Sequence, residues 1–397
     1  MSNKAHKIKL NPTKLQKIFF EKSFGTARYT YNWALVKWQE MYKDGEKPSA
    51  YTLIKHINSI KRDQFPWMLE VGKTCCQYPI HNLEAAYKRM WKKKSGYPKF
   101  KKKGVKDSFV AVENKNQFKQ KDKKIWVPRL GWVKCYEDLR FDGKVNNVVV
   151  TKRAGLYFAV INIETNDIPT KSENQTVVGV DLGIKTLATL SDGTIFENPK
   201  ALKSNIKSLK RLQRGLSRKV KGSNNRKKQQ QRLAKKHYKV SCIRSSAIHQ
   251  ATSYITKNYG TIVLEDLNVK GMSKNRKLSQ EISDVGFGEF RRQIEYKSKW
   301  YGVEVIMADR FYPSSKICSC CGHKKETLKL SERTYSCSNC GAIIDRDLNA
   351  AKNLASLGTT HSVCGSKACG ADANASISCS MVEKHEINYL FNNKIEL

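Results

Sequence analysis

Apolar residues in the first hundred positions recur at the three- and four-residue spacing of helices. Thr13 and Gln16 have the spacing of a capping box, so a helix is predicted to begin there, after a short strand at 7–10. Its expected buried stripe consists of Leu15, Ile18, Phe19, Phe24, Ala27, Tyr31 and Leu35. Further helices are expected over 49–62 and 74–93. Residues 11–95 are therefore predicted to form a helical module.

From Tyr97 onward the pattern changes to the alternation of β-strands. Segments 148–152 and 156–163 alternate in this way and are joined by Arg153-Ala154-Gly155, which predicts a hairpin. We expect residues 1–10 and 96–170 to form one small barrel-like β-domain, interrupted by the helical module. The polar segment 165–175 is expected to be a linker.

The second half of the chain alternates strands with helices, which predicts an α/β domain. An apolar strand at 176–181 is followed by strands 186–190 and 194–196, expected to form an antiparallel meander. Later strands are predicted at 261–265 and 303–307. The expected helices are 246–259, 287–300 and 347–357, the last ended by Gly358. This domain would comprise 171–310 and 342–360, with a cysteine-rich insertion at 311–341 and a largely disordered tail at 361–397.

The charge of the chain points to a polyanionic partner. Its 74 basic and 35 acidic side chains give a formal net charge of +39, which a compact domain tolerates poorly unless a polyanion neutralises it. DNA, RNA and an anionic membrane surface are the candidates. The chain has no apolar run long enough to span a bilayer and no secretory signal. We therefore expect a cytoplasmic, nucleoid-associated protein that binds nucleic acid and no membrane.

The positive charge is concentrated in two segments. Residues 200–239 contain sixteen Lys or Arg and no acid, and are predicted to form two helices broken at 222–224. A solvated face would mix signs, so one sign favours contact with phosphates. The candidate contacts in this segment are Lys210, Arg211, Arg214, Arg218, Arg226 and Lys227. A second basic segment, interleaved with aromatics, adds Tyr97, Lys99, Lys101, Lys102 and Lys103.

Three acids occupy positions that could converge. Asp181 and Glu265 each end an apolar strand, and Asp347 stands at the start of a helix. Taken singly, such an acid is usually a helix cap or an exposed residue. Three acids in one partly buried site repel each other and need cations, for which two magnesium ions, or manganese in their place, are suited. Asp345 is the alternative third acid, but its position favours a capping or supporting role.

Two Cys-X-X-Cys pairs, Cys318/Cys321 and Cys337/Cys340, are separated by fifteen residues and each is followed by glycine. This spacing predicts one structural zinc bound by four thiolates. Cys320 breaks the two-residue spacing and is expected to be a bystander. The remaining cysteines, and a second metal site around His361, are better explained as ordinary buried or tail residues: Cys75, Cys76, Cys135, Cys242, Cys364, Cys369 and Cys379.

Together these motifs resemble the TnpB family of insertion-sequence proteins, relatives of the type V CRISPR effectors. The resemblance covers nearly the whole chain and rests on the segments 179–183, 264–267, 318–340 and 345–351, with support from 11–16 and 97–100. It implies an α/β multidomain protein: an RNase H-like (RuvC) nuclease domain with an inserted zinc ribbon that binds the target nucleic acid, and an N-terminal wedge β-barrel carrying an inserted helical recognition module.

The same resemblance implies the partners. They are a guide RNA from the transposon end and a double-stranded DNA target with a short adjacent motif, since base pairing supplies sequence recognition and protein contacts supply the motif. In this family the motif is recognised near the positions of Lys73 and Gln77, although a plain helix surface is an alternative for these residues.

Two other functions share most of these features. A non-cleaving RNA-guided repressor would lack the nuclease acids, all three of which are present here. A strand-transferring transposase would need a DNA-end-binding domain, for which the sequence gives no pattern. The sequence therefore favours a magnesium-dependent endodeoxyribonuclease.

Overall fold

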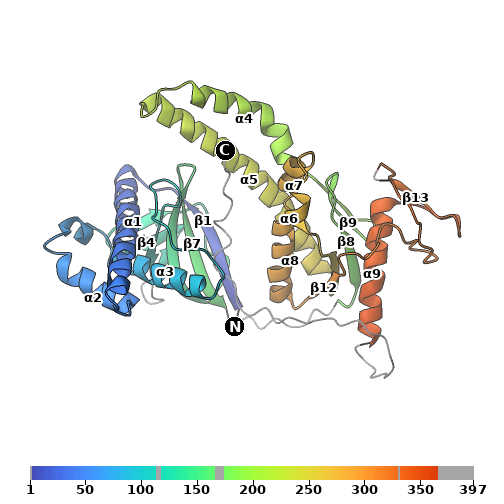
Figure 1. Ribbon diagram of the computed structural model, residues 1–397, viewed down its shortest axis with the longest axis horizontal. Helices are drawn as coiled ribbons and strands as arrows, with labels where there is room; N and C mark the ends of the chain where they lie inside the picture. The colour runs from blue at the N-terminus through green and yellow to red at the C-terminus, as the bar shows by residue number, and fades with distance from the viewer. Residues whose placement is uncertain (1, 113–117, 166–173, 330, 365–397) are drawn as a thin grey trace. The chain divides into compact units, whose positions relative to one another are not determined.

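The computed structural model describes residues 2–112, 118–165, 174–329 and 331–364, and its chain divides into two compact units (Figure 1). The first unit ends at Thr165 and the second begins at Asn174 among the described residues. Of the tail expected to be largely disordered, 361–397, residues 361–364 are instead the end of the last helix, and the rest, with Cys369 and Cys379, lies outside the described residues.

An antiparallel sheet of order β1-β7-β6-β2 forms the centre of the first unit. Its strands are β1 (Ser2–Leu10), β2 (Ser108–Val112), β6 (Lys144–Arg153) and β7 (Leu156–Thr165). The β6–β7 turn consists of Ala154 and Gly155, whose positive φ angles of 52° and 76° suit a two-residue hairpin. The predicted hairpin is confirmed, and so is the inclusion of the N-terminal strand in its sheet.

A smaller antiparallel sheet accompanies the first, formed by β3 (Gln120–Lys121), β4 (Lys124–Val127) and β5 (Gly131–Lys134). The two sheets meet through a bridge between Leu10 and Cys135. Their common core is closed by aromatic residues of the first helix, of which Phe20 is fully buried.

The helical module consists of α1 (Lys14–Lys43), α2 (Ala50–Ile60), a 3-10 turn η1 (Pro66–Glu70) and α3 (Lys73–Trp91). The predicted capping box is present, because Thr13 and Gln16 exchange both hydrogen bonds. The expected buried stripe is wrong in the first two turns, where Leu15 and Ile18 are 78% and 54% exposed. Phe20 sets the buried face, and these two residues lie about 140° and 200° around the helix from it.

A five-stranded sheet of order β10-β9-β8-β11-β12 forms the centre of the second unit. Its strands are β8 (Val177–Asp181), β9 (Thr186–Leu190), β10 (Ile195–Glu197), β11 (Thr261–Glu265) and β12 (Glu304–Ala308). Strands β8, β11 and β12 are parallel, whereas β8, β9 and β10 form the predicted antiparallel meander. The helices against this sheet include α6 (Val269–Met272), α7 (Ser279–Val285) and α8 (Phe287–Tyr301).

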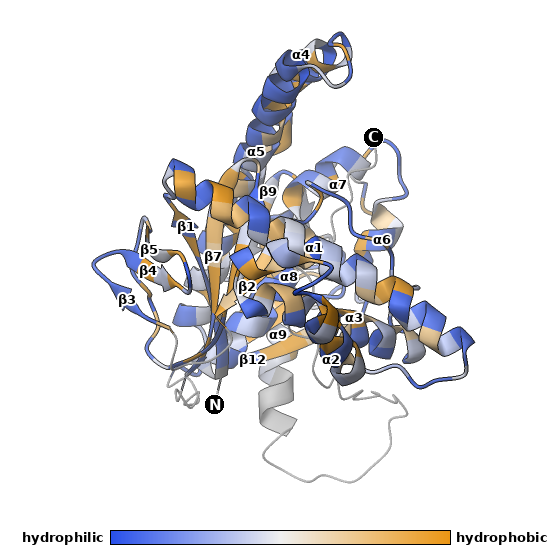
Figure 2. Cartoon of the chain, turned by 90° about the vertical axis from the view of Figure 1, so that its left-hand side faces the viewer, coloured by the Kyte–Doolittle hydropathy of each residue, from blue (hydrophilic) through white to orange (hydrophobic). Residues whose placement is uncertain are grey.

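A long helical hairpin joins β10 to β11. It consists of α4 (Ala201–Ser217) and α5 (Asn224–Asn258), and Ser223 caps the second helix at the predicted break. Helix α5 merges the second basic helix with the one predicted at 246–259. Its later part is buried in the sheet core through Ile248 and Ile255, whereas α4 and the adjoining part of α5 are largely hydrophilic (Figure 2).

The last helix, α9 (Arg346–Cys364), follows the hairpin of β13 (Thr334–Ser336) and β14 (Ile343–Asp345). Gly358 was expected to end this helix, but it lies inside it. A Cβ at Gly358 would come within 2.6 Å of Val177 and 2.8 Å of Val263. The glycine therefore serves the close crossing of α9 over β8 and β11, not helix termination.

Cys75, Cys76 and Cys135 are buried as predicted, but Cys242 is exposed. Within the described part of the chain, no helix combines the length and hydrophobicity needed to cross a membrane.

Candidate functional site

Two of the predicted acids lie at the same edge of the second sheet. Strands β8 and β11 are neighbouring and parallel, with Leu264 paired to Val180, so Asp181 and Glu265 follow at adjacent carboxyl ends. Helix α9 packs along β8 and carries Asp347 in its first turn. A Cβ at Gly179 would lie 2.0 Å from the Ala351 carbonyl oxygen. Glycine at 179 thus allows α9 to pack close against β8, and this packing brings Asp347 to the same edge of the sheet.

The electrostatics of Asp181 indicate a site for positive charge. Its pKa is raised to about 8 by burial and by the negative charges of Glu265 and Asp347, against the opposing effect of Arg346. A carboxyl group with this pKa is largely protonated near pH 7 unless a cation stabilises its charge. The three acids are therefore close enough to interact and are arranged to favour a bound cation.

Neighbouring side chains hold two of these acids in place. The Ser314 hydroxyl donates a hydrogen bond of 2.6 Å to Glu265 Oε1. Asp345 Oδ1 accepts from the backbone N–H groups of Asp347 and Leu348 at 2.9 and 3.1 Å. Asp345 is thus the cap of α9, which confirms the capping role predicted for it. Ser314 was missed, because nothing in the sequence around it distinguishes its position.

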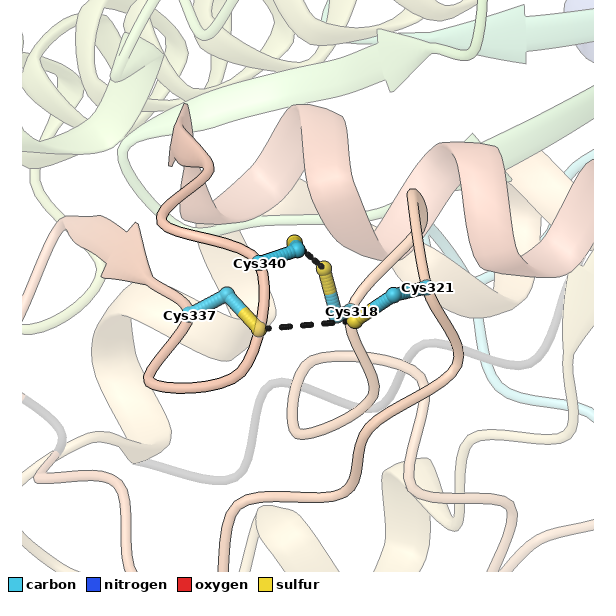
Figure 3. A group of neighbouring side chains, drawn as sticks. All are labelled: Cys318, Cys321, Cys337 and Cys340. Atoms are coloured by element: carbon cyan, nitrogen blue, oxygen red, sulfur yellow. Dashed lines mark hydrogen bonds between the residues drawn. The ribbon is translucent and has the colours of Figure 1, made fainter.

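The four predicted cysteines form one compact cluster, in which every Sγ lies within 4.8 Å of the others. The Sγ atoms of Cys318 and Cys340 are 3.7 Å apart, and those of Cys321 and Cys337 are 3.6 Å apart (Figure 3). Four thiolates at about 2.3 Å from a tetrahedral metal are about 3.8 Å from one another, so the donor set fits such an ion. Cys320 stands outside the cluster, as predicted.

The carboxylates are arranged less tightly than the thiolates. Among the described residues, the cysteines are the only group of three or more potential metal ligands whose donor atoms are all that close. The sites differ accordingly: the cysteines form a closed set of four donors, whereas the three acids do not form so compact a set.

The cysteine cluster is attached to the helix that carries Asp347. The buried Asn349 donates to the Ile317 carbonyl at 2.7 Å and accepts from the Ser319 N–H at 2.9 Å. One turn later, Asn353 donates to the carbonyls of Ser314 and Ile317. These asparagines connect the first cysteine pair and Ser314 to α9. The helix that carries Asp347 therefore also holds the cysteine cluster.

Five of the six cations predicted on the helical hairpin are exposed: Lys210, Arg211, Arg214, Arg218 and Lys227. None of these five has an ion-pair partner in the described part of the chain. Arg226 differs, because its guanidinium donates to the carbonyls of Leu216 and Lys219 at 2.9 and 2.8 Å. Arg226 therefore closes the end of the hairpin.

The second basic segment is attached to α1. Asn32 exchanges two hydrogen bonds with the backbone of Lys101, whose ammonium lies 3.9 Å from the centre of the Tyr31 ring. The Tyr97 hydroxyl lies 3.0 Å from that of Tyr87. Three further predicted contacts in this segment are exposed: Lys99, Lys102 and Lys103.

The remaining predicted contacts lie at the start of α3. Lys73 is exposed and Gln77 is half-buried, one turn later on the same face.

Three family profiles match the chain. A profile described as "Probable transposase" covers residues 160–276, one described as "Cas12f1-like, TNB domain" covers 287–354, and one described as "Helix-turn-helix domain" covers 1–47. The last description does not fit the structure of this chain, in which β1 and the single helix α1 occupy those residues.

Near full-length relatives are known. The chain is 32% identical over 381 residues to InsQ of Escherichia coli (strain K12), provisionally named an RNA-guided DNA endonuclease, covering 91% of this chain and 94% of InsQ. A protein of Streptomyces pristinaespiralis with the same provisional name is 32% identical over 368 residues, covering 91% of each chain.

The fold also resembles a solved structure. The protein chain in a cryo-EM structure of a Cas12f1–sgRNA–target DNA complex superposes with a TM-score of 0.53 at 17% identity, covering 86% of this chain and 83% of that one. At this identity the likeness concerns the fold alone.

Proposed function

The chain belongs to the TnpB family, and on that premise we propose that it is an RNA-guided DNA endonuclease that hydrolyses phosphodiester bonds. The observation that carries the proposal is the meeting of Asp181, Glu265 and Asp347 at one sheet edge, where the pKa of Asp181 is raised to about 8. In a chain of net charge +39, interacting acids in a partly buried site are best explained as ligands for catalytic cations.

The three acids have distinct places in the proposed mechanism. Two magnesium ions, or manganese in their place, would when bound activate a water and stabilise the leaving oxygen. Asp181 would supply a ligand close to the other two acids, whose charges raise its pKa, while Ser314 orients the Glu265 carboxylate. Asp347 approaches from α9, and Asp345 fixes the first turn of that helix. The acids thus come from three separately supported elements.

The proposed partners are a guide RNA from the transposon end and a double-stranded DNA target. Base pairing between them would carry sequence specificity, and the protein would recognise the short adjacent motif. Lys73 and Gln77 are our candidates for that recognition, since Gln can pair with adenine and Lys with guanine or phosphate. The exposed cations of the helical hairpin and of the segment 99–103 would contact phosphates.

We assign domains on the same basis. The first unit would be a wedge β-barrel, from 1–10 and 96–170, carrying the recognition module 11–95. The second would be an RNase H-like (RuvC) nuclease domain, from 171–310 and 342–360, with a zinc ribbon at 311–341. The parallel strands β8 and β11, flanked by the β9–β10 meander and crossed by α9, support the nuclease assignment.

We expect one tightly held zinc per chain, bound by the four clustered cysteines. The ribbon buries only a small apolar cluster around Tyr335, so its fold should depend on the metal. Elemental analysis should give about one zinc per wild-type chain. Cys320→Ser should retain the zinc, because Cys320 stands outside the cluster, whereas Cys337→Ser should lose it. Loss in the Cys320 variant and retention in the Cys337 variant would show that the ligand set is wrong.

The proposed function is tested with the protein purified together with its cellular RNA. That RNA is sequenced to give the guide, and a plasmid library with a matching target and randomised flanks reveals the adjacent motif. We expect double-strand cleavage that requires magnesium and a matching target. Guided binding without cleavage would support a repressor instead, and joining of DNA ends would support a transposase.

A further inference from the structure

A pocket of about 780 Å³ lies in the first unit against α1, and none of the predicted site residues lines it. Its walls include Tyr29 and Trp33 from α1, Trp67 from η1, and Phe100 from the segment before β2. The pocket has the size of small-ligand sites, which are about 300–1,000 Å³ and usually lined by aromatic side chains. Four aromatic rings from three parts of the chain thus meet around one solvent-open space.

Three of these rings are exposed, and two of the three are held by contacts with other rings. Trp67 and Tyr29 are each 39% exposed, and Phe100 is 54% exposed. Tyr29 packs edge-on against Trp67 and Phe65, at 5.1 and 5.3 Å between ring centres. Such contacts fix ring orientation. Clustered apolar surface that stays open to water usually marks an interaction site, and rigid rings favour a flat ligand that stacks on them.

The charge around the pocket selects an anionic ligand. The two cations in its wall are already paired: Lys22 with Glu70, and Arg28 with Asp107 at 3.5 Å. Phe100, however, lies within the segment 92–106, which has eight lysines and no acid. Asn32, itself in the pocket wall, holds the backbone of this segment on α1. The pocket therefore offers aromatic faces beside a strip of lysines, whose charge suits phosphates.

We propose that this pocket holds an unpaired nucleobase of the guide RNA, stacked on Trp67 and Phe100, with the adjoining phosphates bound by the lysines of 99–103. The inference rests on the proposed function. RNA is recognised mainly at unpaired bases, which stack on aromatic side chains, whereas the target DNA strand would be paired with the guide. A proline-rich peptide could also use an aromatic groove, but the lysine strip gives it no matching charge.

The test compares Trp67→Ala and Phe100→Ala with the control Trp132→Ala. Trp132 is a suitable match for Trp67, because it is 40% exposed and also packs edge-on against an aromatic ring, that of Trp126 at 5.6 Å. Filter binding of the sequenced, copurified RNA is measured across a salt series. Both pocket variants should bind about tenfold more weakly, the usual scale of one lost base stack. The dependence of log affinity on log salt should be unchanged, because no phosphate contact is lost.

A second measurement locates the base. Ultraviolet crosslinking with mass spectrometry should join one RNA nucleotide to the pocket, and an abasic RNA at that position should bind the wild type more than about tenfold more weakly, because the stacks on both rings are lost. The same abasic RNA should cost the Trp67→Ala protein less than it costs the wild type, because only the Phe100 stack remains to be lost, and Trp67→Phe should restore most of the affinity. Melting curves control for folding, and Phe100→Ala tests the proposal independently if Trp67→Ala is unstable.

The outcomes separate the inference from the proposed function. If the wild type binds no specific RNA, the proposed function itself fails. If the wild type binds RNA and both pocket variants match Trp132→Ala, only the pocket assignment is overturned. It is also overturned if the variants lose affinity for single-stranded DNA but not for RNA.

Discussion

Replacing Asp181 with asparagine should abolish magnesium-dependent cleavage while leaving guided DNA binding nearly unchanged. The same result is expected for Glu265→Gln and Asp347→Asn, because each change removes one anionic metal ligand and retains the side-chain shape. Loss of an outer-shell partner usually costs about 10- to 100-fold in metal affinity or activity, so loss of a direct ligand should exceed about 100-fold. Nucleic-acid phosphates are bound by cationic side chains, and these three acids are not among them, so guided DNA binding should persist.

Cleavage and gel-shift assays on the same preparations check this prediction. Thermal melting in the presence of a chelator controls for folding. The amide variants should melt at or above the wild-type temperature, because they relieve the repulsion between carboxylates that helps to raise the pKa of Asp181. Asp345→Ala is the matched control. It removes the cap of α9, which costs about 1 kcal/mol of stability, and should still cut. Robust cleavage by Asp347→Asn, with loss in Asp345→Ala, would exchange the roles of these two acids.

The positions of these acids could be predicted because each depends on local pattern. Asp181 and Glu265 follow apolar runs, and parallel strands bring their carboxyl ends to one edge. The cysteine pairs were equally clear, since a two-residue spacing with a following glycine forms a metal-binding turn. Gly322 and Gly341 adopt positive φ angles of 75° and 71° there. Such features can be predicted from a few neighbouring residues, without knowing the tertiary contacts.

Other features depend on packing between distant segments. Gly358 has the local pattern of a helix end, yet it lies inside α9 because Val177 and Val263 pack against it. Ser314 bonds to Glu265, 49 residues away. The aromatic pocket combines Trp67 and Phe100 with α1, and no sequence period connects them. Arg226 was counted among the phosphate contacts, since composition cannot reveal that it caps its own hairpin.

Reversing four charges on α4 should weaken RNA binding strongly and equally for every guide sequence. The variant changes Lys210, Arg211, Arg214 and Arg218 to Glu; all four are exposed and have no ion-pair partner in the described part of the chain. Lys210, Arg211 and Arg214 point away from the apolar face on which Leu209 packs against α5, and Arg218 is the C-cap of α4, so the hairpin should remain folded. Glutamate is also a good helix former. Arg226 is left unchanged because it closes the hairpin.

The size of the effect follows from counterion release. Each phosphate contact lowers the slope of log affinity against log salt by about 0.7 for single strands, so losing four should make it shallower by about 3. Near 0.1 M salt the four lost contacts alone correspond to a loss on the order of 10²- to 10³-fold, and the repulsion added by glutamate should increase it. Filter binding of the copurified RNA across a salt series measures both quantities.

A neutral variant with Gln at the same four positions separates two causes of weaker RNA binding, the loss of phosphate contacts and the added repulsion by glutamate. It should show the same shallower slope with a smaller loss of affinity, because it removes the contacts without adding repulsion. A surface that recognises bases would behave differently, with changed preference at particular positions and a nearly constant slope. If neither affinity nor slope changes, α4 is a solvated face, and the RNA backbone must bind elsewhere. The lysines of 92–106 would then be the next surface to reverse, since they form the other run of positive charge without an acid.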